Sequence, residues 1–156
     1  MNAMPLVYLA GPISGQNLAG ALDWRERARC YLLSEGVQTL NPLRGKDYLN
    51  SIVKDGVYST SYSDHPMSTP HGITMRDKWD ATRCDLLLAY FPPFLTKVSI
   101  GTVMEVAWAS QAGRYVLAVM EPGEVHDHGM LTDSCSLVLR DLDEALRLIP
   151  TILGVR

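Results

Sequence analysis

The sequence predicts an α/β protein built on a parallel β-sheet with helices on both faces. Short, continuous apolar runs alternate along the chain with longer segments of helical periodicity, and several of the runs end at glycine or proline. Unbroken apolarity is typical of strands covered on both faces, and helices between such strands form right-handed βαβ units. The 156 residues, 47% of them hydrophobic, suffice for one domain with its own core.

Each element follows from a local pattern. The expected strands are residues 5–10, 37–40, 84–91, 115–120 and 136–139. The expected helices are residues 18–34, 72–83, 99–113 and 141–149. Gly36 follows the first helix, where a left-handed cap is common. Five strands of this kind predict a flavodoxin-like, doubly wound sheet and a single domain over residues 1–156, with ligands beyond the carboxyl ends of the strands.

Two segments read as loops. Residues 41–70 are rich in glycine, proline and serine, and a connection of that length usually covers a site or is disordered. We therefore expect a long loop or lid over the site. Residues 121–134 form the second expected loop, and the turn at 11–15 brings the backbone close to another group.

Composition excludes several classes of function. The net charge of −3 gives no basic footprint, so a nucleic-acid polymer is not an expected partner. Cys30, Cys84 and Cys135 are far apart in sequence, which argues against a disulfide framework or zinc cluster and fits a cytoplasmic protein. Residues 1–13 lack the pattern of a signal peptide, and no apolar stretch is long enough to cross a membrane.

One charged residue stands out in an apolar helix. Glu105 is the only charge in VSIGTVMEVAWA, residues 98–109, and an isolated buried carboxylate is costly unless it is paired or used. It could pair with Arg83 or Arg114, or it could belong to a functional site. Gly101 lies on the same helix face and leaves room for a ligand.

Polar residues near the other strands have two interpretations each. Ser99 is placed to cap the helix that carries the glutamate, whose first-turn amides offer an anion or hydroxyl site. Tyr8 belongs to the core unless its hydroxyl reaches a polar partner at the strand tip. Asp77, beside Arg76 and Lys78, forms a solvated ion pair by default and a functional acid otherwise.

The loop at 121–134 contains a further polar group. His126 and His128 flank Asp127, and with Asp133 they could hold a metal. A surface-loop histidine or a polar contact to a ligand is the more common interpretation. Asp85 opens a strand, where it can cap or form a salt bridge.

Three segments together resemble a known family. VYLAGPISG, RDKWDATRCDLLLAY and SIGTVMEVAWASQAGRYVLAV are similar in order and spacing to nucleoside 2-deoxyribosyltransferases, over about residues 6–149. The resemblance implies that Glu105 is the nucleophile that holds deoxyribose covalently, that Tyr8 positions its carboxylate, and that Asp77 manages the proton of the departing base. It implies substrate-binding roles for Gly11, Ser14, Ser99, Gly101, His128 and Met130.

The implied chemistry is a double displacement. A carboxylate facing the anomeric carbon stabilises an oxocarbenium-like transition state and then traps it, with overall retention of configuration. Transfer results if a second base accepts the sugar, and hydrolysis if water does. The resemblance implies no metal or organic cofactor, and a homodimer or larger oligomer whose active sites are shared, with His128 and Met130 supplied by the neighbouring subunit.

Some positions differ from the family pattern. Ser99 stands where the nucleoside transferases have an aspartate that holds the sugar 5′-hydroxyl. In this respect the chain resembles the related 2′-deoxynucleoside 5′-monophosphate N-glycosidases, in which a serine at that position contacts the phosphate. Ser14 and His128 do not match that branch. Pro12 and Ile13 replace base-stacking aromatics, so Trp24, Trp79 or a tyrosine of the long loop would have to stack on the base.

The sequence thus favours a nucleoside 2-deoxyribosyltransferase acting on a 2′-deoxynucleoside and a nucleobase. The alternatives are hydrolysis of a 5′-monophosphate on the same scaffold, and a nucleotide-binding domain without catalysis.

Overall fold

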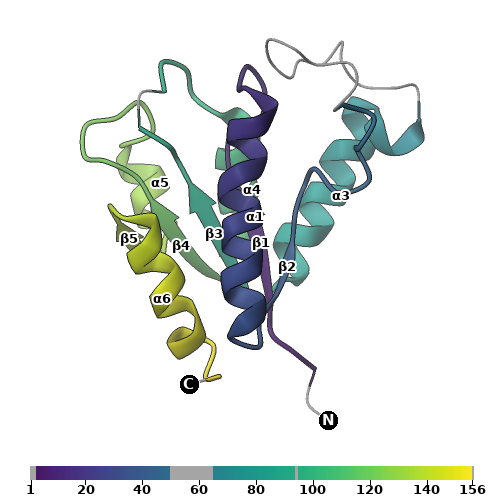
Figure 1. Ribbon diagram of the computed structural model, residues 1–156. Coiled ribbons are helices and arrows are strands. Elements are labelled where there is room, and N and C mark those ends of the chain that lie inside the picture. The colour runs from purple at the N-terminus through teal and green to yellow at the C-terminus, as the bar shows by residue number, and fades with distance from the viewer. Residues whose placement is uncertain (1–2, 50–64, 94, 156) are drawn as a thin grey trace.

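The computed structural model describes residues 3–49, 65–93 and 95–155, and within them the strands form one all-parallel sheet. Its order is β2-β1-β3-β4-β5 (Figure 1). The strands are β1 Leu6–Ala10, β2 Gln38–Leu40, β3 Leu86–Tyr90, β4 Tyr115–Val119 and β5 Leu137–Leu139. This is the strand order of the flavodoxin-like fold, so the predicted fold class is confirmed.

Helices cover both faces of the sheet (Figure 1). One face packs against α1 (Leu18–Ser34) and α6 (Leu142–Ile152). The other face packs against α3 (Pro70–Arg83), α4 (Ile100–Gln111) and the short α5 (Gly129–Asp133). A 3-10 turn, η2 (Pro66–Ser68), precedes α3. The described chain before β1 and after α6 lies at the end of the sheet opposite the carboxyl ends of the strands (Figure 1).

Alternation along β1 explains why its sequence is continuously apolar. Val7 and Leu9 point into the core beneath α1 and α6, whereas Tyr8 and Ala10 point into the core beneath α3 and α4. All four side chains are buried, because successive strand residues face opposite sides of a sheet that is covered on both. This alternation places the hydroxyl of Tyr8 on the face that carries α4.

Several local expectations hold. Gly36 takes the left-handed conformation, with φ of 80°, directly after α1. The Asp85 carboxylate accepts a hydrogen bond from the Leu6 amide at 2.8 Å, and so ties the start of β3 to β1. None of the helices in the described ranges combines the length and apolarity needed to cross a bilayer.

The largest differences from the predicted helices lie at three places. α3 begins at Pro70 because the Thr69 hydroxyl accepts the Gly72 amide and caps the helix. α6 continues through Pro150 to Ile152, and both Ile149 and Pro150 are buried in it. Residues 129–133, expected to be loop, form α5.

The long loop is described only in part. Residues 50–64 lie outside the described residues, so a lid over the site stays a prediction. At its start, Leu43 and Leu49 are buried against Ala21 of α1, and its end forms η2. The described ends of this segment are therefore packed on the domain.

Candidate active site

A buried tyrosine–glutamate pair lies between β1 and α4. The Tyr8 hydroxyl donates to Glu105 Oε1 at 2.6 Å, and Glu105 is only 6% exposed. Neither arginine considered as a structural partner binds this carboxylate: Arg83 binds Asp80, and Arg114 donates to the Thr82 carbonyl. The ion-pair interpretation of the glutamate is therefore wrong.

The electrostatic surroundings favour the neutral form of this glutamate. Burial, followed by the charge of Asp77, raises the pKa of Glu105 to about 8, against the smaller opposing effects of the Tyr8 hydrogen bond and Arg25. The pKa of Tyr8 is raised well above its usual value, first by burial and then by the Glu105 charge, so the phenol remains a donor. A cationic centre forming beside this carboxyl would favour its ionised form.

Asp77 lies close enough to Glu105 for their charges to interact. It projects from α3, and burial raises its pKa, although Arg76, 3.4 Å away, partly offsets this. The expected ion pair with Arg76 is present, but it is not solvated, because both side chains are largely buried. When Asp77 carries a proton, its charge no longer raises the pKa of Glu105. One group can therefore be neutral while the other is ionised, as acid–nucleophile chemistry requires.

Arg25 is a buried cation that sequence reasoning missed. Its guanidinium donates to three backbone carbonyls, of Leu9 at 3.2 Å, Gly11 at 2.8 Å and Ala21 at 2.6 Å. It lies 4.5 Å from the centroid of the Trp24 ring. Burial lowers the pKa of Arg25 to about 10, so it stays charged at neutral pH and fixes the carboxyl end of β1.

A signal for this arginine exists in the sequence. It lies on the buried stripe of α1, in helical register with Ala21, Ala28 and Leu32. A charged residue on such a stripe needs partners, and the end of the neighbouring strand provides them.

The two glycines expected at the site have different surroundings. A Cβ at Gly11 would lie 2.9 Å from both the Trp24 ring and the Tyr90 carbonyl oxygen, so packing within the protein already requires glycine there. A Cβ at Gly101 would meet nothing within 4 Å. Gly101 is exposed, and so is Ser14 in the turn after β1. Contact of Gly11, Ser14 and Gly101 with substrate stays a prediction.

The start of α4 is held by a histidine. The Ser99 amide donates to His126 Nε2 at 2.7 Å, while His126 Nδ1 lies 3.0 Å from Glu124 Oε2. Because Nε2 accepts, Nδ1 carries the proton. The His126 ring is buried, and its centroid lies 4.3 Å from the centroid of the Phe91 ring. The interpretation of His126 as a surface-loop histidine is therefore wrong.

Ser99 occupies the N-cap position but does not cap with its side chain. Its hydroxyl instead lies 2.9 Å from the hydroxyl of Thr102. In the described ranges, no group of three or more histidine, cysteine or acidic side chains could hold a metal ion.

His128 and Met130 lie at the start of α5. The His128 ring accepts the Met130 amide at 3.2 Å, and the Met130 side chain is 78% exposed. Among the described residues, no hydrogen bond or ion pair joins either side chain to Tyr8, Asp77 or Glu105. Their role in a shared active site stays a prediction.

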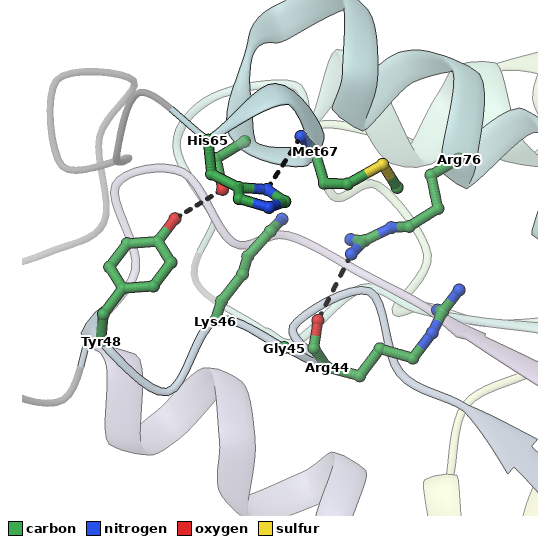
Figure 2. Close-up of a pocket in the computed structure, with 8 residues that line it drawn as sticks. Arg44, Gly45, Lys46, Tyr48, His65, Met67 and Arg76 are labelled. Carbon is green, nitrogen blue, oxygen red and sulfur yellow. Dashed lines mark hydrogen bonds between the residues drawn. The ribbon is translucent and has the colours of Figure 1, made fainter.

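A cavity of about 530 Å³ opens beside Arg76, at the carboxyl end of β2 (Figure 2). It is lined by Arg44, Gly45, Lys46, Tyr48, His65, Met67, Ser68 and Arg76. Among the described residues of the long loop, Tyr48 is the tyrosine that lines it, with its hydroxyl 2.8 Å from that of Ser68. Trp24 is buried on the opposite face of the sheet and Trp79 is exposed on α3, so neither lines this cavity.

Comparison with known proteins identifies the fold. No protein-family model matches the chain, and no curated protein matches it. Solved structures do match over nearly their whole length. A CMP N-glycosidase, BcmB, from Clostridium botulinum is 18% identical with a TM-score of 0.57, covering 94% of this chain and 98% of its own.

Two further structures have the same architecture. A conserved protein from Enterococcus faecalis V583 is 19% identical with a TM-score of 0.62, covering 96% of this chain and 99% of its own. A molybdenum cofactor binding protein from Rippkaea orientalis is 14% identical with a TM-score of 0.59, covering 96% and 97%. At these identities the similarity shows the fold, which is shared by at least one N-glycosidase and one binding protein.

Proposed function

We propose that the protein cleaves the N-glycosidic bond of a 2′-deoxynucleoside and transfers the sugar to another nucleobase through a glycosyl intermediate on Glu105. The observation that carries the proposal is the buried 2.6 Å hydrogen bond from Tyr8 to this glutamate, with Asp77 close enough for the two carboxyl groups to interact electrostatically. Such an arrangement pairs a positioned nucleophile with a separate acid, as glycosidic cleavage requires.

The first displacement forms a sugar ester. A Glu105 carboxylate oxygen attacks the anomeric carbon as the bond to the base nitrogen breaks, and the bonding electrons leave with the base. Asp77 donates its proton to the departing base and becomes ionised. Tyr8 holds the attacking carboxylate in place, and the positive charge that develops on the sugar favours ionisation of the glutamate.

The second displacement reverses these roles. A nitrogen of the acceptor base attacks the anomeric carbon, the ester bond breaks, and the Glu105 carboxylate is released. The proton lost by the acceptor returns to Asp77. Two displacements at one carbon retain the configuration.

The remaining predicted residues complete the proposal. Ser14, Ser99 and Gly101 would contact the sugar, together with the backbone at Gly11. His128 and Met130 would enter the site of a second subunit in a homodimer or larger assembly, a role that suits the exposed Met130 side chain. We place this reaction in the cytoplasm, consistent with the unbridged cysteines.

Hydrolysis of a 2′-deoxynucleoside 5′-monophosphate is the second candidate. Ser99 presents a hydroxyl and no charge at the start of α4, where a carboxylate would repel a phosphate. One structural neighbour is described as a CMP N-glycosidase, which is consistent with this candidate.

Product analysis separates the candidates. The purified protein is incubated with a deoxynucleoside and a free acceptor base, and separately with the corresponding 5′-monophosphate. A new nucleoside supports transfer, and base release from the monophosphate alone supports hydrolysis. Intact-protein mass spectrometry then detects the added pentose and maps it by proteolysis. Binding without turnover, or a pentose on a residue other than Glu105, would refute both.

A further inference from the structure

The segment between β4 and α5 holds a histidine against the first residue of α4. The His126 ring accepts the Ser99 amide at 2.7 Å, although the two residues are 27 positions apart in sequence, and only 2% of His126 is exposed. Ser99 follows β3 and His126 follows β4, so the contact joins the loops at the carboxyl ends of two neighbouring strands. Ligands bind at these ends in sheets of this type.

The loop that carries His126 is braced from within. Glu124 Oε1 accepts the His126 amide at 3.0 Å, and Glu124 Oε2 lies 3.0 Å from Nδ1 of the same ring, so one carboxylate holds both the backbone and the side chain. Asp127 Oδ2 accepts the Gly123 amide at 2.6 Å, and the Asp127 amide donates to the Glu124 carbonyl at 2.9 Å. The ring is therefore presented to Ser99 in one orientation and one tautomer.

Ser99 is held at its amide, its carbonyl and its hydroxyl. The carbonyl accepts the Val103 amide at 3.1 Å, and the hydroxyl lies 2.9 Å from that of Thr102. A serine at an N-cap usually turns its hydroxyl onto an amide of the first turn, and Ser99 does not. Since a hydroxyl has one donor and two acceptor positions, the Ser99 hydroxyl can bind Thr102 and a ligand together.

The spacing along α4 relates Ser99 to the glutamate. Ser99, Thr102 and Glu105 follow one another at i, i+3 spacing, which makes successive members neighbours on the helix surface. The rise from Ser99 to Glu105 is about 9 Å, and helical side chains lean toward the N-terminus of their helix. The Glu105 side chain thus leans toward the end of α4 that Ser99 begins, so the two side chains can bind opposite ends of one small sugar.

We propose that His126 is a positioning residue for the sugar, because it holds the Ser99 hydroxyl in place through the Ser99 amide. This inference rests on the proposed function, which takes Ser99 as a sugar contact; the resemblance assigns this position to the 5′-oxygen. Glu124 acts one step further out, by fixing the tautomer of the ring. Neither His126 nor Glu124 touches the reacting atoms, so their loss should weaken binding more than it slows the chemistry.

A sugar donor without the 5′-oxygen tests this role. KM and kcat are measured with a 2′-deoxynucleoside and with its 2′,5′-dideoxy analogue. His126→Phe keeps an aromatic ring beside Phe91 but has no acceptor for the Ser99 amide. We expect it to raise KM for the deoxynucleoside about three- to tenfold, with less effect on kcat, and to change KM for the analogue by less than about twofold. An equal rise in KM with both donors would overturn the inference.

Two further variants separate positioning from packing. His126→Gln retains an oxygen that can accept the Ser99 amide, and should restore KM to within about twofold of the wild-type value. Ile149→Val lies in the core beneath α6, away from α4, and should lower the melting temperature without changing KM. A KM for His126→Gln as high as that for His126→Phe would overturn the inference. If His126→Phe does not fold, Glu124→Ala replaces it in every comparison, with the same outcomes.

Equilibrium binding separates this inference from the proposed function. Calorimetry compares the common 2′-deoxynucleosides with their 2′,5′-dideoxy analogues on the wild-type and His126→Phe proteins. A preference for the 5′-hydroxyl that depends on His126 supports the inference even if no pentose is found on Glu105, an outcome that refutes only the proposed function. Turnover with a 5′-hydroxyl preference that is unchanged in His126→Phe overturns the inference alone. Absence of both binding and turnover overturns both.

Discussion

Two buried ionisable side chains lie on opposite faces of β1, and their surroundings differ. Arg25, on the buried side of α1, has three backbone carbonyls as hydrogen-bond acceptors and keeps its charge. Glu105, on the α4 face, accepts one hydrogen bond from Tyr8, and its pKa is raised to about 8. Both are enclosed by protein, but only the arginine has its charge fully matched by hydrogen-bonding groups.

The difference separates a structural charge from a reactive one. A buried ion with enough hydrogen-bond partners stabilises its surroundings, and removing it leaves those partners unsatisfied. A buried acid with one partner beside a second acid is held in an unfavourable state that a substrate can relieve. The two residues should therefore respond oppositely to neutral substitution: loss of the arginine should damage the fold, and loss of the glutamate should damage only the reaction.

The largest effect is expected from Glu105→Gln. Without a nucleophilic carboxylate, formation of the sugar ester should stop, and kcat/KM should fall by about 10³-fold or more. The measurement is product formation from a deoxynucleoside or its monophosphate, with mass spectrometry for the adduct. Arg147→Gln, on the exposed side of α6, should keep full activity. An amide variant at position 105 with wild-type activity would refute the assignment.

The same variant should not be destabilised. The folded-state pKa of Glu105 lies above its unfolded value, so the folded protein binds the extra proton between about pH 4.5 and 8. Wild-type stability therefore falls as pH rises through this range, and Glu105→Gln should lack this component. Thermal unfolding at pH 5 and pH 8 checks this, and a steeper pH dependence in the variant would contradict it.

Arg25→Met should show the opposite behaviour. Loss of the guanidinium leaves three carbonyl groups short of a partner, which costs about 2–4 kcal/mol of unfolding free energy and lowers the melting temperature by about 5–15 °C. Arg29→Met is the matched control on the same helix, because Arg29 forms an exposed pair with Glu26. Equal stability of the two variants would contradict the structural role of Arg25.

Tyr8→Phe tests how the reactive charge is tuned. Removing the hydroxyl removes a hydrogen bond that lowers the pKa of Glu105, so the rising limb of the pH profile of kcat/KM should move to higher pH. Activity at pH 7 should fall about 10–100-fold and recover in part toward pH 9. An equal loss of kcat/KM at every pH would show that the Tyr8 hydroxyl does not set the pKa of Glu105.

The fold was predictable because its signals are local. Continuous apolar runs identified the strands, and a capping glycine marked the end of α1. α5 was missed, because its cap is the ring of His128, a residue type without strong capping preference. The expected end of α6 at 149 was wrong because packing of Pro150 extends the helix to Ile152.

The site was less predictable because its contacts are long-range. Apolar surroundings singled out Glu105, but its pairing with Tyr8 joins residues 97 positions apart in sequence. The His126 ring accepts the Ser99 amide and so joins the segments that follow the neighbouring strands β3 and β4. No local sequence pattern encodes this contact. The cavity beside Arg76 combines the turn after β2 with the start of α3, so only the fold brings Lys46 and Arg76 together.

The smallest effect on stability, and the finest test of where substrate lies, is expected from a pair of glycine substitutions. Gly101→Ala adds a methyl group to open space in the first turn of α4, and should stabilise the protein by about 0.5–1 kcal/mol. Since no protein atom opposes this methyl group, a rise in KM for the sugar donor would show that substrate approaches there.

Gly11→Ala should instead destabilise the protein, because its methyl group would meet the Trp24 ring and the Tyr90 carbonyl. Thermal unfolding and KM measured on both variants separate a glycine required by packing from a glycine required by the ligand, and an unchanged KM in Gly101→Ala would remove this residue from the site.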